Sequence, residues 1–412
     1  MRFLSAAPLL ALVPAVLGQD TTILTDLLQS LTSSGLTRLS SIAAQLNSTT
    51  AGQSLLSQLS SGASFVLFAP TDNAFNSASS NITSDADILS SVIAYHVVQG
   101  NFTGISTTYP NTTVGRTLLN NSTLVQLEGN KNQAVAWAAR ADGKVHVLNQ
   151  RNDSIVSNTT TVGNITINIV DHVLNIPQSL AVTVPADNVS LAGIDTALKS
   201  VQLSTNQSGS AAFFDILNTQ LHGFTFFAPN TSAIQAAASS LSSLQSNTTA
   251  LQALFQNHLI NGSTVYSPEL SGQNFTSAAG EPLSFVLNAT GHFVTSGNVT
   301  AQIVQPDVLL PNGVLHVIDR VLLNTQVDSG AASSAASSAS SVATQSTSAT
   351  APIGFPATAT LTGPGGSAPA ASGSGGSGNA AAGGYLVPSM AQVVSVGVAV
   401  LGVVAGGRLV LA

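Results

Sequence analysis

The 412-residue sequence predicts an α+β fold that occurs twice in tandem. Two observations predict it. Three sequence blocks recur in the same order, at offsets of 159, 162 and 148 residues. In addition, a helical spacing of apolar residues comes before short strands in each copy. Helices first and strands later indicate an α+β fold rather than alternating βαβ units.

The first copy shows the predicted elements in order. Apolar residues recur with helical spacing from Ile23 to Leu46. A buried strand over Phe65–Ala69 ends at Pro70, and Thr71 or Asp72 is placed to cap the helix that follows. A further helix is predicted over 88–98, with Asp85 and Asp87 at its N-terminus. The short strands that we expect after it are Thr123–Leu127, Ala134–Ala138, Lys144–Leu148 and Ile165–Val170.

The repeated blocks divide the folded part into two domains. The three pairs of blocks are Phe65–Phe75 and Phe224–Ile234, Val92–Gly100 and Leu254–Gly262, and Ile167–Leu174 and Leu315–Leu322. Three blocks in one order indicate a tandem duplication. We therefore expect one domain over residues 19–178 and a second over 179–326.

These blocks carry a family resemblance. F-A-P-T-D-x-A-F, Y-H-V-V-x-G and the closing N-G-V-L-H-V-I-D-R-V-L of Asn312–Leu322 resemble the fasciclin (FAS1) domain family over roughly 300 residues. The resemblance implies a wedge of two β-sheets with a helical layer, and a role in cell adhesion or in cell-surface and matrix contact. In animal relatives the Tyr-His region is linked to integrin contact, which maps here onto Tyr95 and His96. Asn257 replaces the tyrosine in the second copy, so at most one copy fits that role.

Several other residues of the repeat are candidates for structural roles. His96 and His258 occupy equivalent places inside apolar runs, where a buried, hydrogen-bonded histidine is the favoured interpretation. Asp171 and Asp319 recur at a strand end, and each is expected to bond backbone or a neighbouring side chain. The remaining structural candidates are Asp72 and His316.

Both ends of the chain are typical of processing signals. Residues 1–18 combine a basic start with an apolar run and small residues, which predicts a signal peptide. Residues 327–384 are rich in Ser, Ala and Gly, and Ser329–Gly384 carries no charge, which predicts a disordered, O-glycosylated stalk. The apolar tail 385–412 predicts a glycosylphosphatidylinositol (GPI) signal with Asn379 as the attachment residue. Ser374, Ser377 and Gly378 also fit as attachment residues, and a transmembrane helix is the rival interpretation of the tail.

Composition points to a glycan coat. Only 7% of residues are charged, against about 25% in typical soluble domains, so another group must solvate the surface. Seventeen N-x-[ST] sequons supply candidates for N-glycosylation. Their asparagines are Asn47, Asn81, Asn101, Asn111, Asn120, Asn121, Asn152, Asn158, Asn164, Asn188, Asn206, Asn230, Asn247, Asn261, Asn274, Asn288 and Asn298.

The sequence also excludes several classes of function. A net charge of −7 with ten Lys and Arg argues against nucleic acid, and the lack of cysteine excludes disulfides and thiolate sites. No G-x-S-x-G or histidine metal motif occurs, so we expect neither an enzyme nor a cofactor. The resulting prediction is a non-catalytic adhesion or matrix-interaction glycoprotein at the outer face of the plasma membrane. Its expected partners are cell-surface, matrix or cell-wall components, together with the membrane through the lipid anchor. The alternatives are a structural cell-wall glycoprotein and a small-ligand binder or hydrolase that uses a pocket between the domains.

Overall fold

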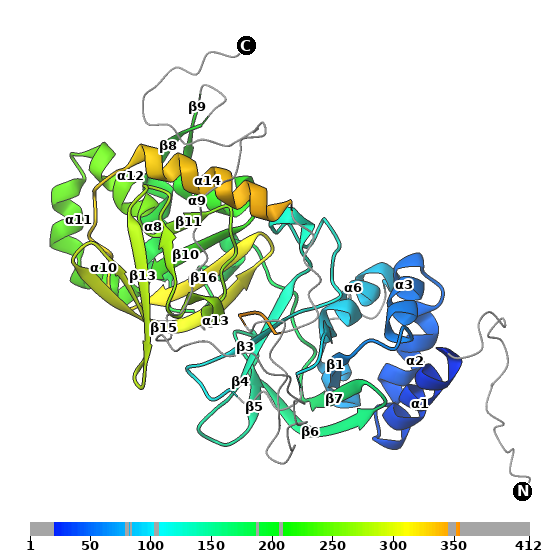
Figure 1. Ribbon diagram of the computed structural model, residues 1–412. Coiled ribbons are helices and arrows are strands. Elements are labelled where there is room, and N and C mark those ends of the chain that lie inside the picture. Colours follow the sequence, from blue (N-terminus) through cyan, green and yellow to red (C-terminus); the bar gives the residue numbers. More distant parts are fainter. Residues whose placement is uncertain are drawn as a thin grey trace, which may run out of the picture.

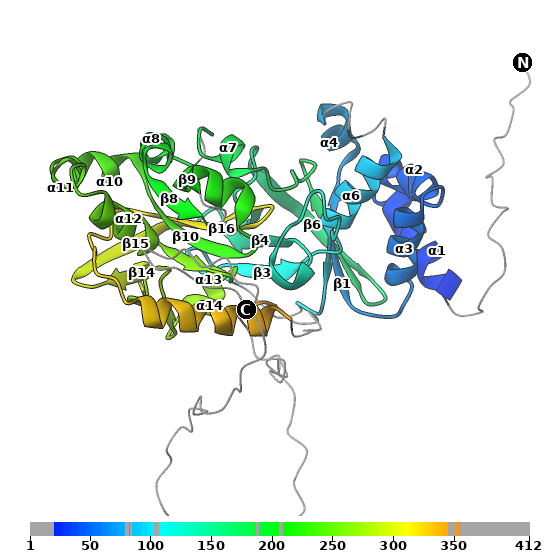
Figure 2. The ribbon, with the colours of Figure 1, turned by 90° about the horizontal axis from the view of Figure 1, so that it is seen from above.

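The computed structural model describes residues 20–78, 82, 85–102, 107–186, 189–205, 209–344 and 352–354. Two α+β domains lie end to end in an elongated molecule (Figures 1 and 2). The predicted leader, the apolar tail and Asn379 lie outside the described residues. Among the described residues, no helix has both the length and the apolar character needed to cross a membrane.

Domain 1 begins with helices and continues with strands, as predicted. Its helices are α1 (Asp20–Ser33), α2 (Thr37–Leu46), α3 (Thr50–Leu59), α4 (Asp72–Ser77), α6 (Ala86–His96) and the 3₁₀ turn η1 (Glu128–Asn130). Its strands are β1 (Phe65–Pro70), β2 (Val97–Gln99), β3 (Thr113–Arg116), β4 (Ala134–Ala139), β5 (Val145–Val147), β6 (Ser154–Val162) and β7 (Ile165–Val170). Helices α1 to α3 cover the end of domain 1 that lies farthest from domain 2 (Figure 1).

Domain 2 repeats this plan. Its helices are α7 (Leu180–Thr183), α8 (Ala192–Ser200), α9 (Phe213–Asp215), the π-helical turn η2 (Ile216–Gln220), α10 (Thr231–Ala236), α11 (Ala238–Leu244), α12 (Thr248–Gln256) and α13 (Ser267–Leu270). Its strands are the hairpin β8 (Gln202–Thr205) and β9 (Gly209–Ala212), then β10 (Phe224–Pro229), β11 (Leu259–Asn261), β12 (Asn274–Thr276), β13 (Pro282–Asn288), β14 (Gly291–Ser296), β15 (Val299–Leu310) and β16 (Gly313–Ile318).

The two domains have the same strand topology. The order is β2-β1-β7-β6-β5-β4-β3 in domain 1 and β11-β10-β16-β15-β14-β13-β12 in domain 2. In each domain the first of these strands along the chain pairs in parallel with the last one along the chain. The parallel pairs are β1 with β7 and β10 with β16. All other neighbours are antiparallel. Matching topology confirms that the chain contains one fold twice.

The strand that carries the first repeated motif is buried on both faces. In β1, Phe65 and Leu67 pack with the helices, whereas Val66 and Phe68 pack with the strands β4 and β5. The Phe68 ring lies 5.4 Å from the Trp137 ring of β4, and the equivalent Phe227 ring lies 5.4 Å from Phe285 of β13. The antiparallel half of each sheet therefore folds over the parallel half, which gives a wedge with a helical layer on one side.

Side-chain caps set the starts of several helices. Thr71 caps α4 by accepting a hydrogen bond from the Ala74 amide, which decides between the two candidates Thr71 and Asp72. Asp85 caps α6 by accepting from the amides of Asp87 and Ile88. Such caps satisfy amides that have no partner within the helix.

The predicted strand Thr123–Leu127 is wrong, because this segment forms turns. The side chain of Asn121 accepts hydrogen bonds from the Thr123 amide and hydroxyl, and its carbonyl accepts from Leu124 and Val125. Local bonding of this kind competes with a strand ladder. The helix predicted over 88–98 ends at His96, where β2 begins. Helix α3 and the strands β3 and β6 were not predicted from the sequence, because their segments are polar or contain Gly or Asn and so lack a clear apolar pattern.

Part of the predicted stalk is folded, which corrects the expectation of disorder from Ser329 onward. Residues Ser329–Ala343 form helix α14, capped by the Asp328 side chain, and the helix lies along domain 2 with its end beside η1 of domain 1 (Figures 1 and 2). Its alanines turn toward the domains and its serines toward solvent. The stalk beyond residue 344 lies outside the described residues except for 352–354.

Candidate functional site at the domain junction

The Tyr-His pair of domain 1 lies in the interior at the end of α6. Both side chains are fully buried. The His96 Nδ1–H donates to the Val92 carbonyl at 2.7 Å, and Nε2 accepts from the Leu174 amide at 2.9 Å. The expectation that Tyr95 and His96 present themselves to a partner does not fit this placement, because neither reaches the molecular surface.

The second copy makes the same histidine contacts. The His258 Nδ1–H donates to the Leu254 carbonyl at 2.8 Å, and Nε2 accepts from the Leu322 amide at 2.9 Å. Each imidazole thus joins the end of a helix to the end of the closing motif. Burial lowers the pKa of His96 and of His258 to about 4, so both rings are neutral at pH 7.

The predicted structural aspartates bond to neighbouring backbone. Asp171 accepts from the Ile155 amide at 2.8 Å, and Asp319 accepts from the Gln302 amide at 2.7 Å, so the two copies use equivalent carboxylates in the same way. Asp72 accepts from the Thr37 hydroxyl and the Arg38 amide, and thereby joins α4 to the start of α2. Slight burial raises the pKa of Asp72, but these hydrogen bonds outweigh it and leave the pKa below its usual value.

Asp307 organises a buried polar cluster between the domains, and the sequence reading missed it. Its carboxylate accepts from the Thr112 hydroxyl of domain 1 at 2.8 Å and from the Ser267 amide at 2.7 Å. Asp307 has a left-handed φ of 58° at a bulge in β15. The predicted structural residue His316 contacts this bulge, since its Nδ1 accepts from the Asp307 amide while Nε2–H donates to the Val265 carbonyl.

Charged groups from domain 1 reach across the junction as well. The Arg116 guanidinium donates to the Tyr266 hydroxyl at 3.0 Å and lies 5.1 Å from the centre of that ring. The buried Glu128 accepts from Lys131 at 2.8 Å and from the Thr264 hydroxyl of domain 2 at 2.7 Å. In the sequence, Arg116 and Glu128 stand out only as charged residues within uncharged segments of a chain that has few charges.

Apolar and backbone contacts complete the junction. Small and branched side chains of both domains form one buried cluster: Val114, Ala134, Ala136, Ala138, Leu148, Tyr266, Leu309 and Val314. The Gln126 amide donates to the Pro311 carbonyl at 2.7 Å, and the Asn149 side chain donates to the carbonyls of Pro306 and Asp307. The two domains are therefore held by a buried, mixed interface rather than by a flexible linker alone.

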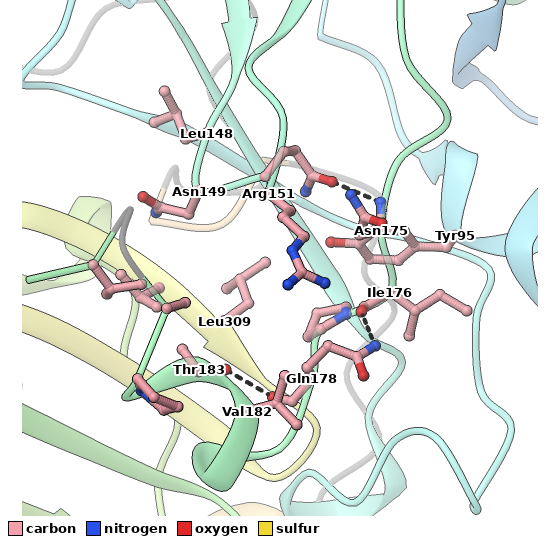
Figure 3. Close-up of a pocket in the computed structure, with 16 residues that line it drawn as sticks. Tyr95, Leu148, Asn149, Arg151, Asn175, Ile176, Gln178, Val182, Thr183 and Leu309 are labelled. Carbon is pink, nitrogen blue, oxygen red and sulfur yellow. Dashed lines mark hydrogen bonds between the residues drawn. The ribbon is translucent and has the colours of Figure 1, made fainter. Parts of the chain in front are cut away.

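A cavity of about 310 Å³ lies beside this interface. Domain 1 supplies the turn 148–151 between β5 and β6, the segment 175–178 and the Tyr95 side chain, while domain 2 supplies residues near α7 and part of β15 (Figure 3). Among the described residues of the lining, Arg151 is the one with a charge. The described lining combines amide, hydroxyl and guanidinium groups with aliphatic walls, so it offers both polar and apolar binding groups.

No metal site is found in the part of the chain that the structure describes: no group of three or more His, Cys, Asp or Glu side chains is placed to hold an ion. His146 lies between Asp142 and Asp153, with nitrogen-to-oxygen distances of 3.1 and 2.9 Å. These bonds hold β5 to the turns on either side of it.

The predicted glycosylation sites lie mostly at the surface. Of the fourteen sequon asparagines within the described residues, Asn230 and Asn261 are half-buried and the others are exposed. Asn81, Asn188 and Asn206 lie outside the described residues. The exposed sites are spread over both domains.

The duplicated wedge with its helical layer defines a tandem-domain protein, and comparison with known proteins gives the family. The Fasciclin domain family matches residues 37–177 and 196–324. These matches cover more than half of the chain, and the chain belongs to this family, with two Fasciclin domains.

The chain is similar to a curated protein and to a solved structure. It is 25% identical over 244 residues to a protein named "Fasciclin-like arabinogalactan protein" from Arthroderma benhamiae, an alignment that covers 58% of this chain and 52% of that protein. The chain thus spans about half the length of this curated relative. A solved structure described as "Novel Fold Revealed by the Structure of a FAS1 Domain Pair from the Insect Cell Adhesion Molecule Fasciclin I" aligns at 17% identity and a TM-score of 0.33, over 74% of this chain and 97% of that chain.

Proposed function

We propose that this protein is a non-catalytic adhesion or matrix-contact glycoprotein of the outer cell surface, in which two Fasciclin domains act as one rigid binding unit. Membership of the Fasciclin family supports the proposal, and so does the printed name of the fungal relative, which describes an arabinogalactan protein. The proposed partners are cell-surface, matrix or cell-wall components. Nucleic acid is not among them, because the chain carries ten basic residues against seventeen acidic ones.

The buried junction is the observation that carries this proposal. Thr112, Arg116 and Glu128 all contact domain 2 through hydrogen bonds in the interior. A fixed relation between two domains presents both surfaces to a partner together, which reduces the entropy lost on binding. Many anchored copies in one plane would add avidity to weak single contacts.

The contact surface in this proposal excludes the family's Tyr-His pair. Tyr95 and His96 are buried, and His258 repeats the contacts of His96. The acidic pair shared between the copies, Asp171 and Asp319, is bonded to backbone amides. The repeated residues therefore serve the fold, which supports binding through exposed surface and glycans rather than catalysis.

The test compares a deletion strain with its parent. Loss of attachment to a host or matrix-coated surface, restored by the full chain and inhibited by the purified protein, would support adhesion. The purified protein with a disrupted junction serves as the matched control and should inhibit less. The alternative, a structural wall glycoprotein, is favoured by the spread of exposed sequons over both domains. It predicts altered sensitivity to wall-perturbing agents with attachment unchanged.

We propose a signal peptide at residues 1–18 and a lipid anchor at Asn379. Treatment of intact cells with phosphatidylinositol-specific phospholipase should release the protein, and mass spectrometry should place its C-terminus near Asn379 and its N-terminus near Gln19. The variant Asn379→Gln, with Ser374, Ser377 and Gly378 also replaced by bulky residues, should not be released. A peptide from residues 393–412 in the mature protein would refute the anchor.

A further inference from the structure

Among the described residues that line the cavity between the domains, the exposed Arg151 is the one that carries a charge. Arg151 lies in the turn between β5 and β6, and its guanidinium extends into the cavity (Figure 3). Among the described residues it forms no ion pair and no hydrogen bond. Asn149 and Gln150, its neighbours in the same turn, have partners that fix the turn: Asn149 bonds to the β15 bulge, and Gln150 accepts from the Asn175 amide at 2.7 Å.

A buried hydroxyl faces the same cavity. Tyr95 is fully buried, its ring lines the cavity, and its hydroxyl has no hydrogen-bond partner of good geometry (Figure 3). The Gln150 side chain lies close to it and slightly offsets the main effect, which is that burial raises the pKa of Tyr95. The hydroxyl therefore stays protonated as a donor. A buried hydroxyl without a well-formed hydrogen bond is an unusual feature of a folded interior.

The remaining walls separate into polar and apolar parts. Asn175 and Gln178 contribute amides from the segment that follows β7. Aliphatic walls come from both domains: Leu148, Ile176, Pro177, Val182, Val308 and Leu309. Val182 is 48% exposed, which is high for an aliphatic side chain in α7 beside a cavity.

We propose that this cavity binds a small organic anion, a carboxylate that carries a short aryl or alkyl group. The carboxylate pairs with the Arg151 guanidinium and accepts from the Tyr95 hydroxyl. The apolar part lies against Leu309 and Val182. The volume of about 310 Å³ is at the lower end of the range for small-molecule sites, so it fits a ligand of this size.

A carboxylate fits these groups better than a neutral sugar. The planar fork of arginine matches the two oxygens of a carboxylate, and such charge-assisted bonds are about twice as strong as neutral ones. A sugar site would offer aromatic faces for stacking, and Tyr95 is the one aromatic residue among the described residues of the lining. This inference is independent of the adhesion proposal, since ligand binding and attachment are measured separately.

The test uses 3-phenylpropionate and its uncharged counterpart 3-phenylpropanamide as probes in ligand-observed NMR titrations of the purified, delipidated glycoprotein. We expect saturable binding of the carboxylate and binding of the amide that is weaker by about tenfold or more. Arg151→Gln should lower the affinity for the carboxylate by about tenfold and leave the amide unaffected. Tyr95→Phe should lower the affinity for the carboxylate by a smaller factor, because this variant removes one neutral hydrogen-bond donor.

Matched controls keep the result interpretable. Arg320→Gln makes the same charge change at an exposed position outside the cavity and should leave binding unchanged. If Arg151→Gln unfolds the protein, as judged by circular dichroism, Ala186→Trp replaces it, because a bulky side chain there fills the cavity and should abolish binding. Equal affinity for the two probes, no saturable binding, or full affinity in folded Arg151→Gln or Ala186→Trp protein would each overturn the proposal.

Discussion

His96 and His258 make the same pair of hydrogen bonds in their two domains. Each donates to a helix carbonyl four residues earlier and accepts from an amide of the closing motif. Only a neutral imidazole with its proton on Nδ1 can do both. Protonation of Nε2 would place an N–H group opposite the N–H of the closing-motif amide. It would also place a positive charge in the interior of the domain. These two residues therefore couple the stability of both domains to pH.

Stability should fall as the pH is lowered from about 6.5 to 4. Burial depresses the folded-state pKa of both histidines to about 4, against the unfolded value of 6.5, so in this window the unfolded chain binds more protons. Full stability is present above pH 6.5, and the loss is on the order of 3 kcal/mol per histidine by pH 4. Urea unfolding at several pH values measures it.

The matched variants are His258→Gln and His222→Gln. His258→Gln should lower stability at pH 7 and flatten the pH dependence, because it removes one of the two buried imidazoles. His222 is exposed, so His222→Gln should leave the pH profile as in the wild type. An unchanged profile in folded His258→Gln protein would contradict this explanation.

Asn230 combines a helix cap with a predicted glycosylation site. Its Oδ1 accepts from the Ala233 amide at 2.7 Å at the start of α10. Asn230→Ala should therefore cost about 0.5–2 kcal/mol through loss of the cap. Ser232→Ala removes the sequon and keeps the cap, so thermal unfolding separates the two effects. If both variants lose equal stability, the glycan rather than the cap is responsible.

At the scale of elements, α14 shows how a low-complexity segment can fold. Its half-buried positions are all alanine: Ala331, Ala332, Ala335, Ala336, Ala339 and Ala343. Glycines lie beneath them, and a Cβ built on Gly262 would lie 3.0 Å from the Ala339 Cβ. Added side chains at Gly129 and Gly280 would meet the backbone of Ala343 and Asp328. Alanine has the highest helix propensity, and here its methyl groups pack against bare backbone.

A bulky residue on the inner face of α14 should release the helix. Ala339→Leu has no room above Gly262, and overpacking of this kind costs about 1–3 kcal/mol. Hydrogen exchange over residues 327–344 should become faster. Ser338→Leu, one position away on the exposed face, should leave exchange near that of the wild type. Equal effects of the two variants would show that the alanine face is not what holds the helix.

At the scale of the whole molecule, the junction joins two copies of one fold through residues that the copies do not share. Three hydrogen-bonded pairs cross the junction, each with its first residue in domain 1 and its second in domain 2: Thr112 with Asp307, Arg116 with Tyr266, and Glu128 with Thr264. The contacts are buried and hydrogen-bonded, so each partner depends on the other. We expect the two domains to unfold together.

Loss of the Glu128 side chain should uncouple the unfolding of the two domains. Glu128→Ala leaves Thr264 without its acceptor and Lys131 without its counter-charge, at a cost of about 1–3 kcal/mol because Lys131 is partly exposed. Calorimetry should then resolve two transitions where the wild type shows one. Asp195→Ala breaks an exposed pair with Lys199 within domain 2 and should cost less than about 1 kcal/mol with a single transition retained. Two transitions in the wild type would contradict tight coupling.

Predictability from the sequence differs between the core and the junction. The buried strand Phe65–Ala69 was found because its apolar run and the following Pro70 are local signals. The strand predicted over Thr123–Leu127 was wrong because Asn121 closes a turn there. The sequence allowed a pocket between the domains but did not indicate Asp307 or Arg151. A single carboxylate or arginine in a sequence does not show which residue it faces across 150 or more positions.

The sequence by itself determined the duplication, the α+β class and the family, because repeated blocks and apolar periodicity reflect how each domain buries its own core. It also provided the sequons and the patterns at both ends that predict a signal peptide and a lipid anchor. Only the tertiary structure decided that Tyr95 is buried beneath a cavity, that Arg151 faces it, and that α14 packs on both domains. The physical reason is that contacts between domains depend on surfaces assembled from distant segments, and no local pattern encodes their complementarity.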